Sequence, residues 1–317
     1  STPLYSSAAS DVYKRQAHVR TCELGLVSTT EAVLLMAYGS PDSLDEVGAY
    51  YTHIRGGRQP SAEAVAGLQE RYRRVGGRTP LLDITRQLQH SLEQLLARTG
   101  GRATRVYIGM KHWHPYIADT VRSMHADGVT HVTAIALAPH YSRISIEGYR
   151  QALQQAAADQ GAEFAITFVA SWHRHQAFID LLADRVGAAL GRFPPFARQT
   201  VTTVFTAHSL PEKIRQWNDP YESEVAESGA AVARRVGLTD WRVAWQSAGA
   251  TGEPWIGPDI LDTLTQLAAD GVRHVLQVPI GFVCEHLEIL YDIDAVSYTH
   301  LRAHETKANL VCRLLLE

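Results

Sequence analysis

The sequence is poor in cysteine and has neither a long apolar run nor a surplus of basic residues. Its three cysteines, Cys22, Cys284 and Cys312, form no Cys-x-x-Cys pair, which argues against a disulfide framework and favours a reducing compartment. No apolar run approaches the roughly 20 residues that span a bilayer, and the N-terminus lacks the basic-then-apolar pattern of a signal peptide. We therefore expect a cytoplasmic protein without stable membrane insertion.

The charge balance and several missing motifs exclude further classes of protein. Thirty Lys and Arg residues against 33 Asp and Glu residues give a net charge of −3, so no basic surplus is available to bind nucleic acid. The motifs HExxH, GxSxG, GxxxxGK(S/T) and GxGxxG are absent. The triplet His286-Leu-Glu288 is similar to the His-x-Glu of zinc deaminases, but their Pro-Cys-x-x-Cys partner is missing.

The residues that are present alternate between short apolar runs and longer amphipathic patterns, over a length of about two typical domains. The expected strands span residues 32–37, 104–109, 131–138, 165–170, 202–206, 242–246 and 274–278. The expected helices include residues 62–75, 83–98, 116–127, 147–159 and 220–235. Strands of nearly continuous apolar character, separated by helices, are typical of a doubly wound α/β fold with parallel sheets.

An internal repeat divides this pattern into two halves. Residues 114–132 and 257–275 share ten identities at a fixed offset of 143 positions. Each copy predicts a Pro in the first turn, an amphipathic helix, a Gly cap and a buried strand. We infer two similar open-sheet lobes, with Tyr38 and His208 at corresponding strand ends. Because ligands of such folds bind beyond the carboxyl ends of the strands, both side chains are candidates to face a shared cleft.

Two segments carry side chains suited to metal chemistry. His208 follows a buried strand in VFTAHSLPEKI, where a neutral imidazole could ligate a borderline metal or accept a proton, or could simply be a loop histidine. In the second segment we expect a helix from about Val283 that places Glu285, Glu288 and Asp292 on one face. That stripe is either a solvated face or a set of carboxylate ligands for an ion such as ferrous iron.

Eight motifs, in order, together resemble those of ferrochelatases, and more narrowly those of the water-soluble coproporphyrin ferrochelatases of Gram-positive type. The resemblance covers residues 31–294. The motifs are MAYGSP (36–41), YYTHIRGGRQP (50–60), Arg71-Tyr72 to TPLLDIT (79–85), YIGMKHWHPYI (107–117), APHYS (138–142), FTAHSLPEKI (205–214), AWQSAGATGEPWIGPD (244–259) and PIGFVCEHLEILYD (279–292).

This resemblance implies a chelatase-like fold, in which two related Rossmann-like lobes with parallel four-stranded sheets flank a porphyrin cleft. It implies a lyase of haem biosynthesis that inserts Fe²⁺, its substrate, into coproporphyrin III. His208 and Glu288 match the catalytic, metal-handling pair, although their division into metal ligand and proton acceptor stays open. Asp292 would hold or feed metal, and Tyr38 would be an axial iron ligand.

The resemblance also implies a set of porphyrin contacts and a range of alternatives. The porphyrin-binding positions are Tyr38, Arg55, Arg71, Tyr72, Thr79 and Tyr149, with Thr79 in place of the usual serine and His112 loosely placed near the cleft. Arginine suits propionates because its guanidinium donates in a bidentate fork. The alternatives are a protoporphyrin IX ferrochelatase, a sirohydrochlorin-type chelatase and a haem-binding carrier. We expect a monomer without an iron–sulfur cluster, because the native-looking part holds only Cys22 and Cys284.

The two ends of the chain differ from the rest. We divide the chain into a first lobe at residues 17–165 and a second lobe at residues 166–296, with tails at residues 1–16 and 297–317 that resemble translated sequencing-adapter read-through. Val296 stands where the family has a further acid. We therefore expect the chain to lack the family's closing C-terminal helix.

Overall fold

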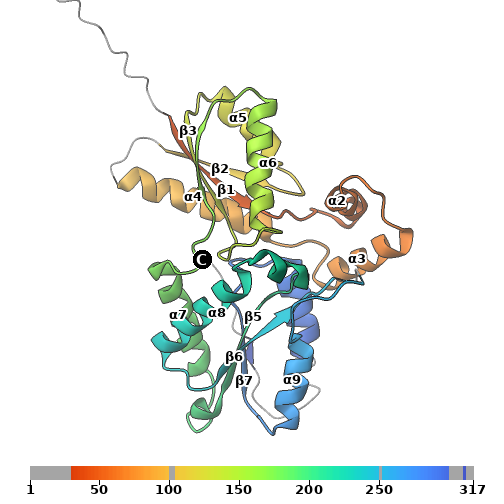
Figure 1. Ribbon diagram of the computed structural model, residues 1–317, viewed down its shortest axis with the longest axis vertical. Coiled ribbons are helices and arrows are strands. Elements are labelled where there is room, and N and C mark those ends of the chain that lie inside the picture. The colour runs from red at the N-terminus through yellow and green to blue at the C-terminus, as the bar shows by residue number, and fades with distance from the viewer. Residues whose placement is uncertain (1–29, 100–103, 250–251, 300–309, 312–317) are drawn as a thin grey trace, which may run out of the picture.

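A computed structural model describes residues 30–99, 104–249, 252–299 and 310–311. The tail predicted at residues 1–16 and most of the tail predicted at 297–317 lie outside these described residues. The chain forms two α/β lobes, one above the other in Figure 1, each with a parallel sheet that has helices on both faces. This confirms the predicted fold class.

The sheet of the first lobe has the strand order β2-β1-β3-β4, and all its pairs are parallel. Its strands are β1 (Glu31–Ala37), β2 (Arg105–Met110), β3 (His131–Ala136) and β4 (Ala165–Val169). Leu34 and Met36 of β1 pack against the helices α5 (Ile117–Ala126) and α6 (Ile146–Asp159), whereas Ile108 and Met110 of β2 pack near Leu81 of α4 (Leu81–Arg98). Helices thus cover both faces of the sheet, as the apolar strands predicted.

The sheet of the second lobe has the order β6-β5-β7-β8. Its strands are β5 (Thr202–His208), β6 (Trp241–Gln246), β7 (Val275–Pro279) and β8 (Leu310–Val311). Phe205 and Ala207 belong to the apolar core beneath α7 (Gln176–Gly191) and α8 (Tyr221–Val236). Val204 belongs to the core beneath α9 (Ile260–Ala269), because successive side chains of a strand point to opposite faces. The two-residue strand β8 was not among the expected strands.

The helices agree with the predicted ranges to within two residues, but two were not predicted. Those expected from the sequence are α3 (Ala62–Arg74), α4 (Leu81–Arg98), α5 (Ile117–Ala126), α6 (Ile146–Asp159), α8 (Tyr221–Val236) and, from the repeat, α9 (Ile260–Ala269). The additional helices are α2 (Val47–Ile54) and α7 (Gln176–Gly191). Short 3-10 turns form η1 (Leu44–Glu46), η2 (Arg198–Thr200) and η3 (Glu212–Trp217).

The internal repeat is a structural repeat. Helices α5 and α9 are both ten residues long and begin 143 positions apart. Each is followed by a glycine in the left-handed region, Gly128 at φ 71° and Gly271 at φ 80°, which confirms the predicted Gly caps. The prolines differ from expectation, because Pro115 and Pro258 precede the N-cap residues and so lie outside the first helical turn.

The boundary between the lobes lies later than predicted. Strand β4 pairs with β3 from His131↔Ala165 to Ile135↔Val169, so it belongs to the sheet of the first lobe. The predicted boundary after residue 165 would separate this strand from its own sheet. The chain crosses to the second lobe between Val169 and α7, whose apolar side chains join the core of the second lobe.

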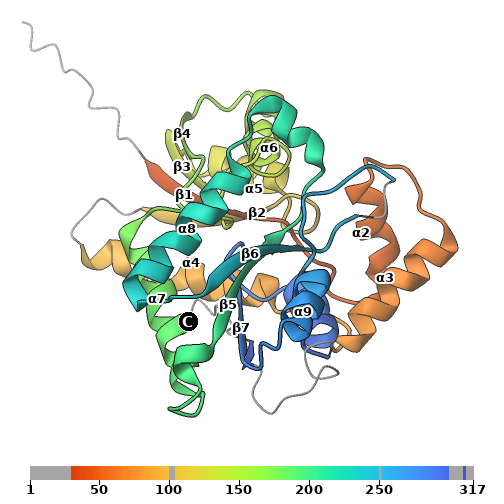
Figure 2. The same cartoon turned by 60° about the horizontal axis from the view of Figure 1, so that its bottom comes forward.

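An arm formed by α2 and α3 extends from the first lobe beside the second. In both ribbon views this arm projects on the side where α9 lies (Figures 1 and 2). Leu68 of α3 and Leu287 of the second lobe pack on the same cluster, which contains the buried Tyr50 and Tyr72. The arm therefore forms one side wall between the lobes.

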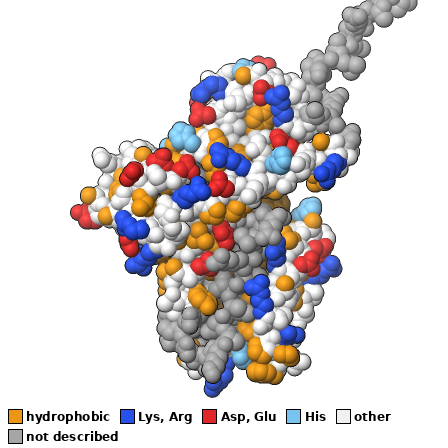
Figure 3. All heavy atoms as spheres, turned by 180° about the vertical axis from the view of Figure 1, so that it is seen from behind, with side chains coloured by type: hydrophobic (Ala, Val, Ile, Leu, Met, Phe, Trp, Pro, Cys, Tyr) orange, Lys and Arg blue, Asp and Glu red, His pale blue; other side chains and the backbone are white. Residues whose placement is uncertain are grey.

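The surface is of mixed charge. Lys, Arg, Asp and Glu side chains are interspersed over the upper part of the face seen in Figure 3. Among the described residues, no helix combines the length and the apolar character needed to cross a bilayer.

Candidate active site between the two lobes

A cleft of about 1150 Å³ lies where the carboxyl ends of the two sheets meet. Its walls come from both lobes, with Tyr38 after β1 and Tyr149 of α6 on one side and His208, Trp255 and Glu288 on the other. Ligands of open α/β sheets bind at this edge, and the volume matches that of a large ligand site. The prediction that Tyr38 and His208 face one cleft is confirmed.

His208 and Glu288 form a pair in the wall of the cleft. The His208 Nε2 atom lies 3.4 Å from Glu288 Oε1, and the two side chains are 29% and 33% exposed. His208 Nδ1 donates a hydrogen bond to the carbonyl oxygen of Ser209, and the Tyr221 hydroxyl donates to the carbonyl oxygen of His208 at 3.0 Å. These bonds orient the ring so that Nε2 is the nitrogen available to a ligand, as in metal-binding histidines.

The pair is held in its charged form. Burial opposes the imidazolium of His208, but the charge and the hydrogen bond of Glu288 outweigh it and raise the pKa of His208 to about 9. Burial likewise opposes ionisation of Glu288, but His208, followed by His286, lowers the pKa of its carboxyl below the ordinary value. His286 Nε2 lies 3.5 Å from Glu288 Oε2. An incoming metal cation must therefore displace a proton from this pair.

The helix that carries Glu288 begins later than predicted. It is the π-helix η4 (Glu288–Ser297), with Leu287 as its N-cap, rather than a helix from about Val283. Glu285 precedes this helix and is not part of the cleft lining, so the predicted stripe of three carboxylates is wrong. The wider turn of a π-helix places Glu288 and Asp292 on the same face, and both line the cleft.

The rest of η4 continues this wall. The Asp292 carboxylate accepts a hydrogen bond from the Ser247 hydroxyl, while burial raises the pKa of Asp292. Val296, on the next turn, also lines the cleft and carries no ligand atom. Within the described ranges no three His, Cys, Asp or Glu side chains are grouped closely enough to hold a metal ion. The imidazole of His208 and the carboxylate of Glu288, which both line the cleft, are donor types that a divalent cation such as Fe²⁺ binds.

On the first lobe, the phenol of Tyr38 lies beside the imidazole of His112. The Tyr38 side chain is 44% exposed, and its ring packs against His112 with centroids 4.5 Å apart. His112 Nδ1 lies 3.3 Å from His53 Nδ1. Burial, followed by Lys111 and His53, lowers the pKa of His112 to about 4. His112 therefore lines the cleft as a neutral ring. From the sequence its position was known only as near the cleft.

Three of the five other predicted porphyrin contacts line the cleft. Arg71 lies with its guanidinium carbon 5.6 Å from the ring centre of Tyr291 on η4, so it links α3 to the helix of Glu288. The Tyr72 hydroxyl is 3.0 Å from Ser40 Oγ, and burial raises the Tyr72 pKa to about 12. Tyr149 is buried beneath Lys111, whose Nζ is 5.2 Å from its ring centre.

Thr79 and Arg55 do not form part of the cleft wall. Thr79 is buried and donates to Ser40 Oγ at 2.8 Å, so its hydroxyl supports the chain that holds Tyr72. Arg55 is exposed at the end of α2, with its guanidinium carbon 5.8 Å from the ring centre of Tyr51. Their predicted direct contact with a ligand does not follow from this structure, because Thr79 lies behind Ser40 and Arg55 is exposed outside the lining.

Several lining residues were not singled out in the sequence. They are Lys111, His140, Tyr221, Gln246, Ser247, Trp255 and His286. All of them except Tyr221 lie within the quoted motifs, so membership of those motifs was the available signal. His140 follows β3 of the first lobe and Gln246 ends β6 of the second, and only the meeting of the two lobes places both in one cleft.

Comparisons with known proteins agree with this geometry. A family model described as ferrochelatase matches residues 30–314. A ferrochelatase from Herpetosiphon aurantiacus is 49% identical over 268 residues, which are 84% of this chain and 88% of that protein. A coproporphyrin III ferrochelatase from Bacillus subtilis is 41% identical over 264 residues, which are 83% and 85% of the two chains.

Two solved structures support the fold alone. The structure of SirB from Bacillus subtilis with Fe³⁺ matches with a TM-score of 0.52 at 10% identity, over 90% of this chain and 88% of that one. A sirohydrochlorin chelatase SirB from Bacillus subtilis subspecies spizizenii, in complex with cobalt, matches with a TM-score of 0.50 at 10% identity, over 89% and 86% of the chains. Because the sequence match covers most of its length, this chain belongs to the ferrochelatase family.

Proposed function

We propose that this protein is a coproporphyrin III ferrochelatase, a lyase that inserts Fe²⁺ into coproporphyrin III to give coprohaem. The observation that carries the proposal is the pair of His208 Nε2 and Glu288 Oε1, 3.4 Å apart in the wall of a cleft of about 1150 Å³. A relative from Geobacillus kaustophilus, 40% identical over 271 residues, is also named coproporphyrin III ferrochelatase and supports the substrate.

The reaction has three requirements that the cleft can meet. Fe²⁺ must lose water, the macrocycle must distort so that a pyrrole lone pair points out of its plane, and two pyrrole N–H protons must leave. The imidazolium proton of His208 would first pass to solvent. His208 and Glu288 would then ligate the entering Fe²⁺ and accept the pyrrole protons, and each proton would pass on to solvent before the next transfer. The rigid walls from two lobes would distort the macrocycle through binding energy at its edges.

The other predicted residues take places around this centre. Asp292, one turn along η4, would hold Fe²⁺ on its way to Glu288. Tyr38, on the opposite lobe, would be the axial ligand of the product iron. Arg71, Tyr72 and Tyr149 would contact the porphyrin, whereas Thr79 would act from behind the lining through Ser40. Arg55 would still reach a propionate that extends past the cleft rim.

Anaerobic metallation tests the proposal directly. Purified protein is mixed with Fe²⁺ and either coproporphyrin III or protoporphyrin IX, and the metallated spectrum is followed. We expect faster metallation of coproporphyrin III. If only protoporphyrin IX is metallated, the assignment of coproporphyrin III as substrate is wrong. Binding of porphyrin without metallation would instead favour a haem-binding carrier. The monomeric state, the cytoplasmic location and the lack of an iron–sulfur cluster stay predictions.

A further inference from the structure

Two buried side chains of the cleft carry polar atoms that have no hydrogen-bond partner within the described residues. His140 is 2% exposed and its Nδ1 atom is unpaired, and Gln246 is 1% exposed with both amide atoms unpaired. Both side chains line the cleft. Because a buried polar atom without a partner is costly, such atoms in a binding cleft indicate contacts that a ligand completes.

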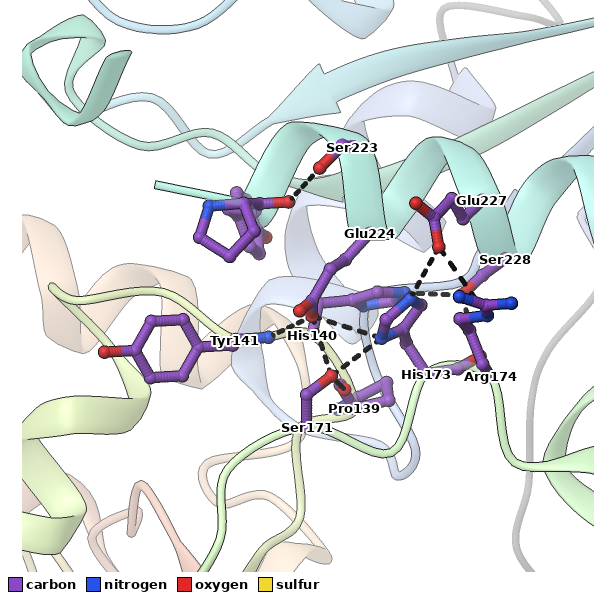
Figure 4. Close-up of polar contacts among 12 residues, drawn as sticks. Pro139, His140, Tyr141, Ser171, His173, Arg174, Ser223, Glu224, Glu227 and Ser228 are labelled. Carbon is purple, nitrogen blue, oxygen red and sulfur yellow. Dashed lines mark hydrogen bonds and ion pairs between the residues drawn. The ribbon is translucent and has the colours of Figure 1, made fainter. Parts of the chain in front are cut away.

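The hydrogen bonds of His140 determine which of its nitrogens carries the proton. His140 Nε2 lies 3.0 Å from the hydroxyl oxygen of Ser228, and that hydroxyl donates to the carbonyl oxygen of His173 at 3.0 Å (Figure 4). The single hydroxyl hydrogen of Ser228 is used in the hydrogen bond to the His173 carbonyl oxygen. The Ser228 oxygen must therefore accept the hydrogen bond from His140, whose proton is on Nε2. The opposite tautomer would lose one bond and bury an unpaired N–H.

The His140 ring is also neutral and fixed in place. Burial, followed by the neighbouring His173, lowers the pKa of His140 to about 3. The carboxylate of Glu224 on α8 accepts from the backbone N–H of Tyr141 at 2.6 Å, so the residue after His140 is tied to the same helix as Ser228 (Figure 4). His140 Nδ1 is therefore a bare acceptor with a defined direction.

We propose that His140 is a binding residue of the cleft whose Nδ1 accepts a hydrogen bond from a donor that the substrates bring. This inference rests on the proposed function for the identity of the ligand. Two substrate groups share the required chemistry, namely a pyrrole N–H of the porphyrin and a water molecule bound to the entering metal. Both are donors, and both are lost or displaced as the metal enters the macrocycle.

Histidine-selective ¹⁵N NMR on the wild-type protein tests the proposal and separates the two donors. The free protein should show His140 with a protonated Nε2 and a bare Nδ1, assigned by its loss in His140→Gln. Metal-free coproporphyrin III, or Zn²⁺ as a diamagnetic metal probe, is then added separately. If porphyrin moves the ¹⁵N chemical shift of Nδ1 toward the value of a hydrogen-bonded nitrogen, the donor is the pyrrole N–H. If Zn²⁺ alone causes this change, the donor is the metal-bound water. No movement with either overturns the proposal.

Two matched variants give a second test that needs no turnover. His140→Gln keeps a donor toward Ser228 but has no acceptor at the Nδ1 position, whereas His140→Asn places Oδ1 at that position. If porphyrin is the donor, we expect metal-free coproporphyrin III to bind about 5- to 10-fold more weakly to His140→Gln, the effect of one hydrogen bond, and His140→Asn to recover most of the loss. Equal binding by both variants would contradict a pyrrole contact.

The metallation assay on the same wild-type sample distinguishes the two proposals. A sample that shows the Nδ1 shift without metallation would contradict the proposed function and leave His140 a ligand-binding residue. A sample that metallates without an Nδ1 shift would remove His140 from substrate binding.

Discussion

His208 and Glu288 show how a single residue acquires its chemical role from its neighbours. The Nδ1–H bond to the Ser209 carbonyl directs Nε2 toward Glu288, and the carboxylate stabilises the imidazolium. The first contact is with the next residue in the chain, whereas the second is not local, because Glu288 follows His208 by 80 positions. The reactivity of the pair is thus a property of the approach of η4 to the end of β5.

Removing the imidazole tests its role in catalysis. In His208→Ala we expect kcat to fall by about 10²- to 10⁴-fold, since a metal ligand or proton acceptor is lost, with porphyrin binding largely kept. Anaerobic metallation and fluorescence titration with metal-free porphyrin measure the two effects. His90→Ala on the exposed face of α4 is the control. Normal turnover by His208→Ala would remove this residue from the mechanism.

The charge of the pair also predicts a pH dependence of stability. The pKa of His208 is about 9 in the folded protein, above its ordinary value of 6.5. A raised folded pKa means that the stabilisation is fully present below pH 6.5 and is lost as the pH rises through 9. We expect the Tm of the metal-free wild type to exceed that of Glu288→Gln at pH 6, and the gap to shrink toward pH 10. A gap that stays constant over this range would show that the pair is not charged.

At the scale of elements, the loop between β7 and η4 determines where the metal-handling helix begins. Gly281 lies against the end of β5, where a Cβ would be 2.8 Å from the Ala207 Cβ and 3.1 Å from its Cα. Only a glycine allows this approach. The contact lies one residue from His208, so it couples the position of η4 to that of the imidazole.

Substitution of Gly281 should therefore affect both stability and activity. In Gly281→Ala we expect the free energy of unfolding to fall by about 1–3 kcal/mol, as in other overpacked sites, and kcat to fall as Glu288 moves from His208. Denaturant unfolding and metallation measure these effects. Gly187→Ala in the exposed middle of α7, where an added Cβ meets nothing within 4 Å, should instead stabilise by about 0.5–1 kcal/mol. If Gly281→Ala changes neither the free energy of unfolding nor kcat, the proposed link between the position of η4 and that of His208 is wrong.

At the scale of the whole molecule, one carboxylate joins the two lobes beside the cleft. Glu224 of α8 accepts hydrogen bonds from Tyr141 N at 2.6 Å and Ser171 Oγ at 2.8 Å, and its carboxylate lies 3.2 Å from His173 Nδ1 (Figure 4). These three partners follow β3 and β4 of the first lobe. The Glu224 side chain is only 13% exposed, so its contacts are made with little competition from water.

Loss of this carboxylate should loosen the lobes. We expect Glu224→Ala to lower the free energy of unfolding by about 2–4 kcal/mol, because it leaves several buried donors unpaired, and to raise the KM for porphyrin. Glu227→Ala is a close control, since Glu227 lies on the same helix near the same His173 but is 51% exposed. We expect that control to change stability by less than about 1 kcal/mol. Similar losses in both variants would contradict the role of Glu224.

Local patterns in the sequence were sufficient to predict most elements. Buried parallel strands are short and apolar, and their helices are amphipathic and capped, so β1 to β7 and α3 to α6 were found near their true bounds. The start of η4 was not predicted correctly. Val283 and Cys284 precede the helix as loop residues, and each is buried in a different apolar core. Helix α2 and the lobe boundary were likewise decided by packing.

The sequence by itself determined the two related lobes and the family, since these depend on periodicity, on the repeat and on motif order. Through the resemblance to that family it also indicated His208 and Glu288, whose contact the fold produces. Only the tertiary structure decided which predicted residues share the cleft. It placed Arg71, Tyr72 and Tyr149 in the lining and Arg55 and Thr79 outside it. It also brought His140 and Gln246 there with unpaired atoms. The physical reason is that side-chain direction and hydrogen-bond partners depend on residues distant in the chain, which no local pattern encodes.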